Sequence, residues 1–239
     1  MPLPTISTPI YQLELPSTKE IIDYRPFLVK EEKLLVLALE SEDTKQITTA
    51  IKQVIKGCIK TKGIKVETLP TFDIEFLFLN IRGKSVGEEV EVNIIAPDDE
   101  TTSIPVTIAI DEIKVKETED HTKQIKVDDD LMMEMKYPSL DQFIKSNFDF
   151  KEGNNMEQSF DLIATCIDKV FNEEEVWSTA DCTKKEIVGF LEQMNTQQFK
   201  EIEKFFETMP KLSHEIEVTN PKTKVKSTVV LEGLSSFFA

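Results

Sequence analysis

The sequence predicts an α+β fold built from two related helix-rich halves, each of which ends in a β-hairpin. Apolar residues recur at helical spacing in several segments, which is typical of helices with one buried face. Near the end of each half, apolar and polar residues alternate instead, which indicates half-buried strands. A helix-then-strand pattern at residues 69–95 recurs at 199–220, so we expect a duplicated unit. We place the two halves at residues 1–136 and 137–239.

The first half is expected to open with a hairpin and two helices. Pro16, Ser17 and Thr18 form a turn signal between short runs that are typical of strands. A helix is expected from about residue 29 to 39, and a second one begins where Asp43 or Thr44 can cap it and ends near Gly57 and Gly63. The second helix carries its apolar side chains at the spacing of a core stripe, namely Ile47, Ile51, Val54, Ile55 and Cys58.

The segment 69–95 is expected to run from a helix into a strand. Thr71 can cap the helix, because its hydroxyl can accept a backbone N–H of the first turn. Gly83 and Gly87 mark the helix end, since glycine enters left-handed conformations at little cost. One helix face carries Phe72, Phe76, Leu79 and Gly83, and the strand that follows alternates Val90, Val92 and Ile94 with polar residues.

Shorter elements complete the prediction. Strands are expected near residues 106–113, 125–127 and 131–136. The second half is expected to be helical until its last hairpin, in which Ile216 and Val218 point inward. One of its helices is predicted from an apolar stripe made of Phe160, Ile163, Ala164, Ile167 and Phe171.

The two halves also match upstream of the helix-then-strand pattern. The string DYRPFLVKEEKLL, which begins at Asp23, parallels KYPSLDQFIK, which begins at Lys136. The string VIKGCI, which ends at Ile59, parallels LIATCI, which ends at Ile167. Because the spacings between these matches differ, the alternative is a chance similarity of amphipathic segments.

Composition narrows the class of protein. The formal net charge of −16 would repel phosphates, so we expect no nucleic-acid partner. The sequence has no run of 18 apolar residues, so we expect no membrane span. The first residues lack the features of a signal peptide. Cys58, Cys166 and Cys182 have no CxxC spacing and are expected to be reduced thiols, the first two as buried apolar side chains.

Residues for catalysis are scarce. The sequence has no P-loop and no GxGxxG pattern. The two histidines, His121 and His214, form no recognisable metal-binding spacing with a cysteine or an aspartate. We therefore predict that the protein is not an enzyme, with no catalytic residues, no metal and no cofactor. A hydrolase that uses the acidic run 128–130 is the alternative from another class.

Aromatic and arginine side chains near chain connections are the candidate partner contacts, because such side chains dominate binding hot spots. Trp177, the only tryptophan, follows three glutamates and is either a partner anchor or a lid over the core. The acidic surface favours a different protein with a basic patch over a second copy. Closing the protein's own core is the alternative for the others. The candidates are Tyr24, Arg25, Phe27, Trp177, Phe237 and Phe238.

Four uncommon strings, in order along almost the whole chain, resemble one known family. They are YRPFLVKEEKLLVLALES, LPTFDIEFLFLNIRGKSVGE, FFETMPKL and VLEGLSSFF. In these strings the chain resembles the T-even-type bacteriophage (myovirus) baseplate proteins, which are hub components of contractile tails. The resemblance implies a structural component of the hub that binds other hub and tail proteins. The alternative is a tail-assembly chaperone that binds hub subunits transiently and is not retained in the mature virion.

The resemblance also bears on location and on metal. It implies a place in the tail baseplate of the virion, or in the host cytoplasm during assembly. Relatives look as if they carry cysteine pairs in the loops of both terminal hairpins, where zinc could pin the turns. The equivalent loops, residues 96–103 and 220–224, contain no cysteine. We therefore expect a degenerate zinc-ribbon-like fold whose hairpins are held without metal, with Pro97, Pro105 and Pro221 adding stiffness.

Overall fold

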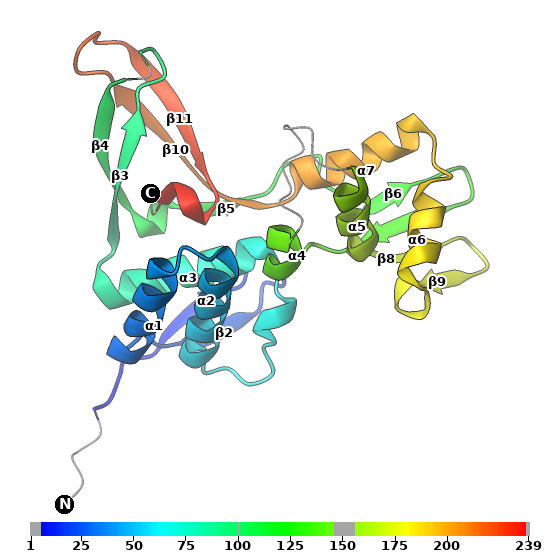
Figure 1. Cartoon of the computed structure of the whole chain (residues 1–239), viewed down its shortest axis with the longest axis horizontal. Helices are drawn as coiled ribbons and strands as arrows, with labels where there is room; N and C mark the ends of the chain where they lie inside the picture. The colour runs from blue at the N-terminus through cyan, green and yellow to red at the C-terminus, as the bar shows by residue number, and fades with distance from the viewer. Residues whose placement is uncertain (1–5, 100, 146–155, 238–239) are drawn as a thin grey trace, which may run out of the picture. The chain divides into compact units, whose positions relative to one another are not determined.

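The chain forms two compact units in a computed structural model that describes residues 6–99, 101–145 and 156–237 (Figure 1). Unit 1 combines Met1–Lys116 with Lys211–Ala239, and unit 2 is Glu117–Pro210. This division differs from the predicted halves 1–136 and 137–239. The reason is that the last hairpin returns to pair with a strand near residue 115, and such a long-range pairing leaves no trace in local periodicity.

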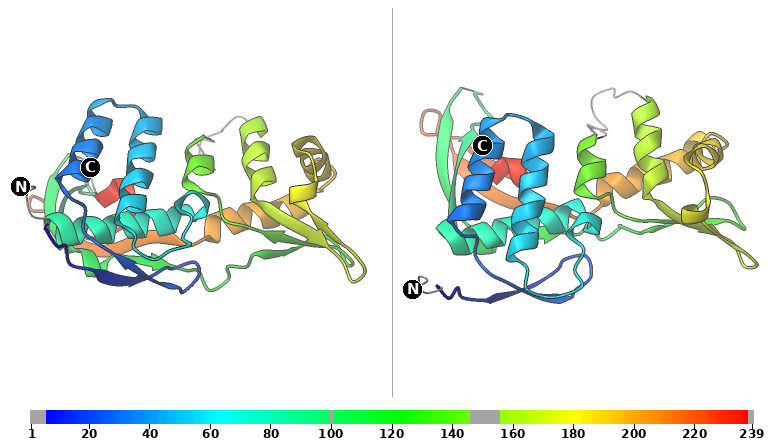
Figure 2. Two further views of the ribbon diagram at one scale, coloured as in Figure 1. Left: turned by 90° about the horizontal axis from the view of Figure 1, so that it is seen from below. Right: turned by 60° about the horizontal axis from the view of Figure 1, so that its bottom comes forward.

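Unit 1 begins with the predicted hairpin and helices. Its first elements are β1 (Tyr11–Glu14), β2 (Ile21–Tyr24), α1 (Val29–Glu40), α2 (Thr44–Cys58), the 3-10 turn η1 (Val66–Thr68) and α3 (Thr71–Val86). Helices α1 and α2 lie side by side (Figure 2). Asp43 caps α2 as expected, because its carboxylate accepts the Lys45 backbone N–H at 2.8 Å. Pro70, not Thr71, occupies the cap position of α3, so this helix begins one residue earlier than predicted.

The rest of unit 1 is made of antiparallel strands. They are β3 (Glu89–Ile95), β4 (Ser103–Ala109), β5 (Lys114–Lys116), β10 (Lys211–Thr219) and β11 (Lys226–Glu232), with 3-10 turns η2 (Ile110–Glu112) and η4 (Leu234–Phe237). β3 pairs with β4, while β11, β10 and β5 form a three-stranded sheet in that order. The strand predicted at 106–113 ends at Ala109, and η2 begins at the next residue.

The core of this region lies between the two hairpins, β3–β4 and β10–β11, which lie side by side (Figure 1). β3 buries alternate residues, as its sequence predicts. Helix α3 contributes Leu79, and η4 contributes Phe237. The strand and turn residues that are buried there are Val90, Val92, Ile94, Ile108, Ile110, Ile113, Leu212 and Val218.

Unit 2 is a four-stranded antiparallel sheet with helices. Its elements are β6 (Gln124–Lys126), β7 (Met132–Met135), α4 (Leu140–Lys145), α5 (Met156–Cys166), β8 (Ile167–Phe171), β9 (Val176–Ser178), the 3-10 turn η3 (Thr179–Asp181), α6 (Lys184–Leu191) and α7 (Thr196–Thr208). The sheet order is β6–β7–β8–β9.

The prediction that the second half is helical until its last hairpin is wrong at residues 167–171 and 176–178. The stripe that predicted one helix through Phe171 is split: α5 ends at Cys166, and β8 begins at Ile167. An apolar run of this length is compatible with a helix or with a strand. Residues 167–171 form a strand because they pair with β7.

The expected duplication is visible as a common order of elements. A hairpin, two helices, a third helix and a final hairpin occur as β1–β2, α1, α2, α3 and β3–β4, and again as β6–β7, α4, α5, α7 and β10–β11. The second copy contains β8, β9 and α6 in addition.

One backbone pattern recurs in both copies. The Arg25 N–H donates to the Cys58 carbonyl at 3.0 Å, and the Lys136 N–H donates to the Cys166 carbonyl at 2.7 Å. Next to these bonds, Tyr24 pairs with Ile59, and Met135 pairs with Ile167. The matched strings VIKGCI and LIATCI therefore occupy equivalent places in the two units.

Candidate functional site

The segment Tyr24 to Phe27 connects β2 to α1 and lies largely inside unit 1. Tyr24 is 2% exposed and Arg25 is 6% exposed, while Phe27 is half-buried. Tyr24 and Arg25 are therefore buried within unit 1, as expected if this segment closes the protein's own core instead of contacting a partner. The physical reason is that β2 and the end of α2 meet here, so that both side chains are covered from two elements.

Arg25 forms a buried ion pair with Glu31 of α1. The Arg25 Nη2 donates to Glu31 Oε1 at 2.9 Å, and the Glu31 Oε2 also accepts the Leu28 backbone N–H at 2.8 Å. Burial acts to raise the pKa of Glu31, but the hydrogen bonds from Arg25 and Leu28 outweigh it, so the pKa is lowered. The ion pair thus joins the connection before α1 to the first turn of that helix.

The C-terminal segment is also docked on unit 1. Phe237 is 1% exposed and packs into the core between the two hairpins. The Leu234 N–H donates to Glu75 Oε1 of α3 at 3.2 Å. Burial raises the pKa of Glu75 to about 7. Phe238 lies outside the described residues. Glu75 was not among the predicted site residues, and nothing in its local sequence indicates a contact with the far end of the chain.

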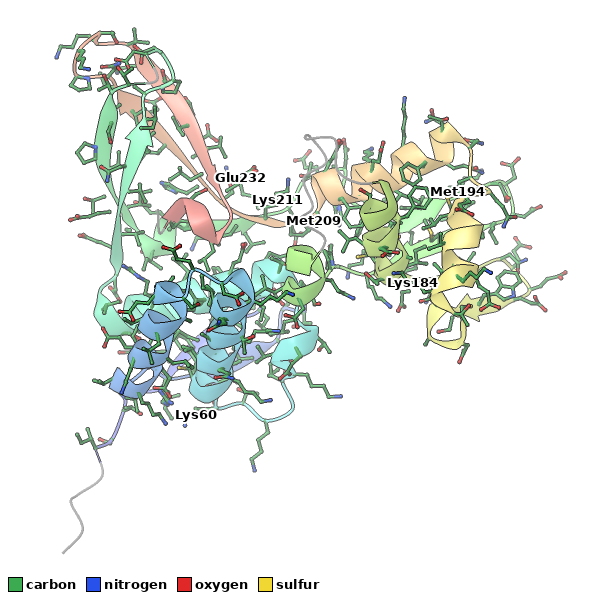
Figure 3. All side chains as sticks on the ribbon, in the orientation of Figure 1. Lys60, Lys184, Met194, Met209, Lys211 and Glu232 are labelled. Atoms are coloured by element: carbon green, nitrogen blue, oxygen red, sulfur yellow. The ribbon has the colours of Figure 1, made fainter. Side chains whose placement is uncertain are left out.

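Among the candidate contacts that the structure describes, Trp177 is the most exposed, at 43%. It lies on β9 and borders a groove of about 340 Å³ in unit 2, here named the Trp177 groove. Helix α6 forms one wall, and Figure 3 labels Lys184 at its first turn and Met194 beyond its end. The lining is mainly apolar and comprises Leu131, Ile167, Val170, Trp177, Ile187 and Phe190, with Thr179, Cys182 and Glu186.

Carboxylates lie close to this apolar surface. The exposed residues Glu173, Glu174 and Glu175 precede Trp177 in the turn between β8 and β9. At the opposite wall, Glu186 accepts the Thr183 hydroxyl and backbone N–H, each at 2.7 Å. Both hydrogen bonds lower the pKa of Glu186, and the bond from the Thr183 hydroxyl has the larger effect. An apolar groove beside negative charge favours a partner segment with an apolar side chain and basic neighbours.

The loops of the two terminal hairpins are joined by a polar cluster. Asn220, which is 1% exposed, donates through Nδ2 to Asp98 Oδ1 at 3.0 Å and to Asp99 Oδ2 at 3.2 Å. Its Oδ1 accepts the Lys222 backbone N–H at 2.8 Å. The Thr223 hydroxyl donates to Asp98, and this bond is the main reason that the pKa of Asp98 is lowered.

Metal ligands are not grouped in the part of the chain that the structure describes, where no three or more His, Cys, Asp or Glu side chains could share an ion. A zinc-ribbon-like arrangement without metal stays a prediction, with the polar cluster around Asn220 as its physical basis.

The histidines occupy structural positions in separate units. His121 Nδ1 lies 3.0 Å from the Thr208 hydroxyl, and Nε2 lies 2.9 Å from the Tyr137 hydroxyl. The ring also packs on Phe205, and burial lowers the pKa of His121. His214 lies on β10, with Nδ1 3.4 Å from the Glu112 carbonyl oxygen.

The sequence contains one G-x-S-x-G string, at residues 83–87. In serine hydrolases this pattern holds the serine on a sharp turn between a strand and a helix. Here Ser85 lies within α3, where its hydroxyl donates to the Ile81 carbonyl and accepts the Phe27 N–H at 2.9 Å. The string therefore lacks the structural setting of a nucleophile.

These features define a class of α+β proteins with two compact units, small antiparallel sheets and exposed apolar surfaces suited to contacts with other proteins. The chain belongs to the family of T4 bacteriophage base plate proteins, whose model matches residues 8–239. The comparisons with curated proteins and with solved structures gave no match.

Membership in this family implies other phage baseplate proteins as partners and a place in the virion tail. None of the described helices is long and apolar enough to cross a membrane.

Proposed function

We propose that this protein is a structural or assembly component of the baseplate hub of a contractile-tailed phage, and that it acts by protein–protein interaction without enzymatic chemistry. The family match over residues 8–239 carries the proposal. The Trp177 groove adds a surface on which a hub protein can dock.

The groove defines the chemistry of the partner segment. An apolar side chain would enter between Trp177 and α6, because burying apolar surface drives association. Lysine or arginine neighbours on that segment would face Glu173, Glu174 and Glu175. Tyr24, Arg25 and Phe237 are buried in unit 1, so Trp177 is the candidate contact on which the proposal rests.

Pairwise binding to each purified hub protein of the phage tests the proposal. Trp177→Ala should weaken binding to one of them by roughly 30-fold, since a hot-spot residue contributes about 2 kcal/mol or more. Val230→Ala is the matched control, because Val230 is also an exposed apolar residue, at 52%, but lies on β11 in unit 1. Equal affinities of wild type and Trp177→Ala for every hub protein would refute the role of the groove.

Mass spectrometry of purified particles separates the structural role from the chaperone role. A hub component should be found in mature virions in a fixed ratio to the other hub proteins. Binding to a hub protein without retention in particles would assign the transient assembly chaperone instead. Turnover of a cell-wall substrate by the purified chain alone would contradict both and indicate a hydrolase.

A further inference from the structure

Helix α1 carries an exposed apolar surface. Residues 34–39 of this helix read LLVLAL, so its second half is apolar on all sides. Ala38 is buried and faces the unit, and Leu34 and Leu35 are half-buried. Val29, Val36, Leu37 and Leu39 are 79%, 48%, 54% and 60% exposed.

A helix that is apolar on all sides is usually covered on all sides. In unit 1, α1 packs on α2, where Leu34, Leu37 and Ala38 line a groove together with residues of α2, and Val29, Val36 and Leu39 are exposed outside that groove. Several large apolar side chains close together on one helix face mark an interaction surface.

The charges on this helix indicate what covers it. Lys33 lies in its first half and Glu40 is its last residue, one on either side of Val36 and Leu37. Both are exposed. The last turn of α1 contains no basic residue, so nothing within that turn balances Glu40 and the negative end of the helix dipole.

A second copy of the helix, turned antiparallel about a two-fold axis, would supply the missing cations. With the axis midway between Val36 and Leu37, Val36 of one copy faces Leu37 of the other. In the same register Lys33 of each copy faces Glu40 of the other. Every contact then occurs twice, which is the self-complementarity that a two-fold interface requires.

We propose that the exposed face of α1 is a self-association surface, on which a second copy of this chain pairs antiparallel. The surface lies in unit 1 and the proposal is independent of the Trp177 groove. One helix face is smaller than the roughly 800 Å² per partner of a standard interface, so the dimer is weak and depends on concentration. The charge of −16 on each chain opposes pairing at long range, but physiological salt screens such repulsion beyond about 8 Å.

Two charge-reversal variants test the register. In a dimer of Lys33→Glu, the new carboxylate at position 33 of each copy would face Glu40 of the other, and in a dimer of Glu40→Lys, Lys33 would face the new ammonium group at position 40. Each purified variant should therefore sediment as a monomer at concentrations where the wild type forms dimers. When the two variants are mixed, every facing pair is again opposite in charge. Sedimentation of the mixture should then show dimers, and native mass spectrometry should identify them as heterodimers.

Lys226→Glu on β11 is the matched control, because it makes the same charge change at an exposed residue away from α1 and should leave dimer formation unchanged. Unchanged melting temperatures of all variants will exclude misfolding as the cause. A wild type that stays monomeric at several hundred micromolar would overturn the proposal. So would dimers that persist in both single variants, or a mixture that stays monomeric.

Discussion

Buried and half-buried carboxylates connect distant parts of unit 1 through single contacts. Glu31 binds Arg25, and Glu75 accepts the Leu234 N–H from the far end of the chain. Asp73, which is fully buried, accepts the Ser17 backbone N–H at 3.0 Å and so ties the first hairpin to α3. Among the described residues, no buried side-chain nitrogen or oxygen lacks a hydrogen-bond partner. Each carboxylate is therefore costly to disturb from either side.

Arg25→Met should lower the free energy of unfolding by about 3 kcal/mol, because it leaves the buried Glu31 carboxylate with the exposed Lys30 as its cationic partner. Urea unfolding followed by circular dichroism measures this loss. Adding Glu31→Gln should recover part of it, since a neutral amide can still accept the Leu28 N–H. A double variant as unstable as the sum of the two single variants would contradict this coupling.

Glu75 should make unit 1 less stable as the pH rises. Its pKa is raised from 4.5 to about 7 in the folded chain, so folding retains a proton that the unfolded chain releases. The stabilisation is complete below pH 4.5 and is lost as the pH rises to about 7, a change of about 3 kcal/mol. Glu75→Gln should remove this dependence when urea unfolding is measured between pH 5 and 8. The same slope in the variant would exclude Glu75 as its source.

Close contacts between elements place the helices against the strands of unit 1. Gly83 of α3 lies against Ile110 of η2, where a Cβ on residue 83 would come within 2.9 Å of the Ile110 Cδ1. The sequence put Gly83 on the apolar face of this helix, and the close approach of η2 explains why a residue without a side chain stands there.

Gly83→Ala should destabilise the protein by about 1 kcal/mol. Crowding against Ile110 costs roughly 1–3 kcal/mol, and the higher helix propensity of alanine offsets about 1 kcal/mol of this. Ile110→Val removes the Cδ1 atom, so thermal unfolding of the double variant should show a smaller loss than the two single losses together. Strict additivity would mean that the two residues are not coupled.

The two hairpin loops should keep their structure when metal is removed. Asn220 joins them through hydrogen bonds, and neither loop has a thiolate for a tetrahedral zinc site. We therefore expect the same melting temperature with and without EDTA. Elemental analysis that finds one zinc per chain would show that the loops are held differently.

At the scale of the whole molecule, the chain divides unequally. Unit 2 is one continuous segment, whereas unit 1 combines the start of the chain with its last hairpin. Unit 2 has a core of its own, to which the sheet and helices α5, α6 and α7 contribute. Continuity and a separate core are the properties of a segment that folds alone.

The fragment Glu117–Pro210 should therefore fold by itself. Its thermal unfolding should be cooperative, and the fluorescence of Trp177 should match that of the full chain before unfolding. The matched control is the segment 1–116, which lacks β10, β11 and Phe237 and should be unstable because its hairpin core is left open. A fragment 117–210 without a cooperative transition would show that unit 2 depends on the rest of the chain.

The sequence alone predicted the elements with strong local signals. Asp43 before an apolar stripe predicted α2, and the alternation of Val90, Val92 and Ile94 predicted β3. Cys58 and Cys166 are buried, as their place on apolar faces indicated. The family was predicted from uncommon strings and is confirmed over residues 8–239.

Only the tertiary structure decided which surfaces remain for partners. Arg25 and Phe237 looked like contact residues, but β2, α2 and the two hairpins bury them from positions far away in the sequence. The groove beside Trp177 depends on α6 and β8, which are separated from it by turns. Residues 167–171 became a strand because β7 lies beside them. Local periodicity depends on neighbours along the chain, whereas burial and strand pairing depend on neighbours in space.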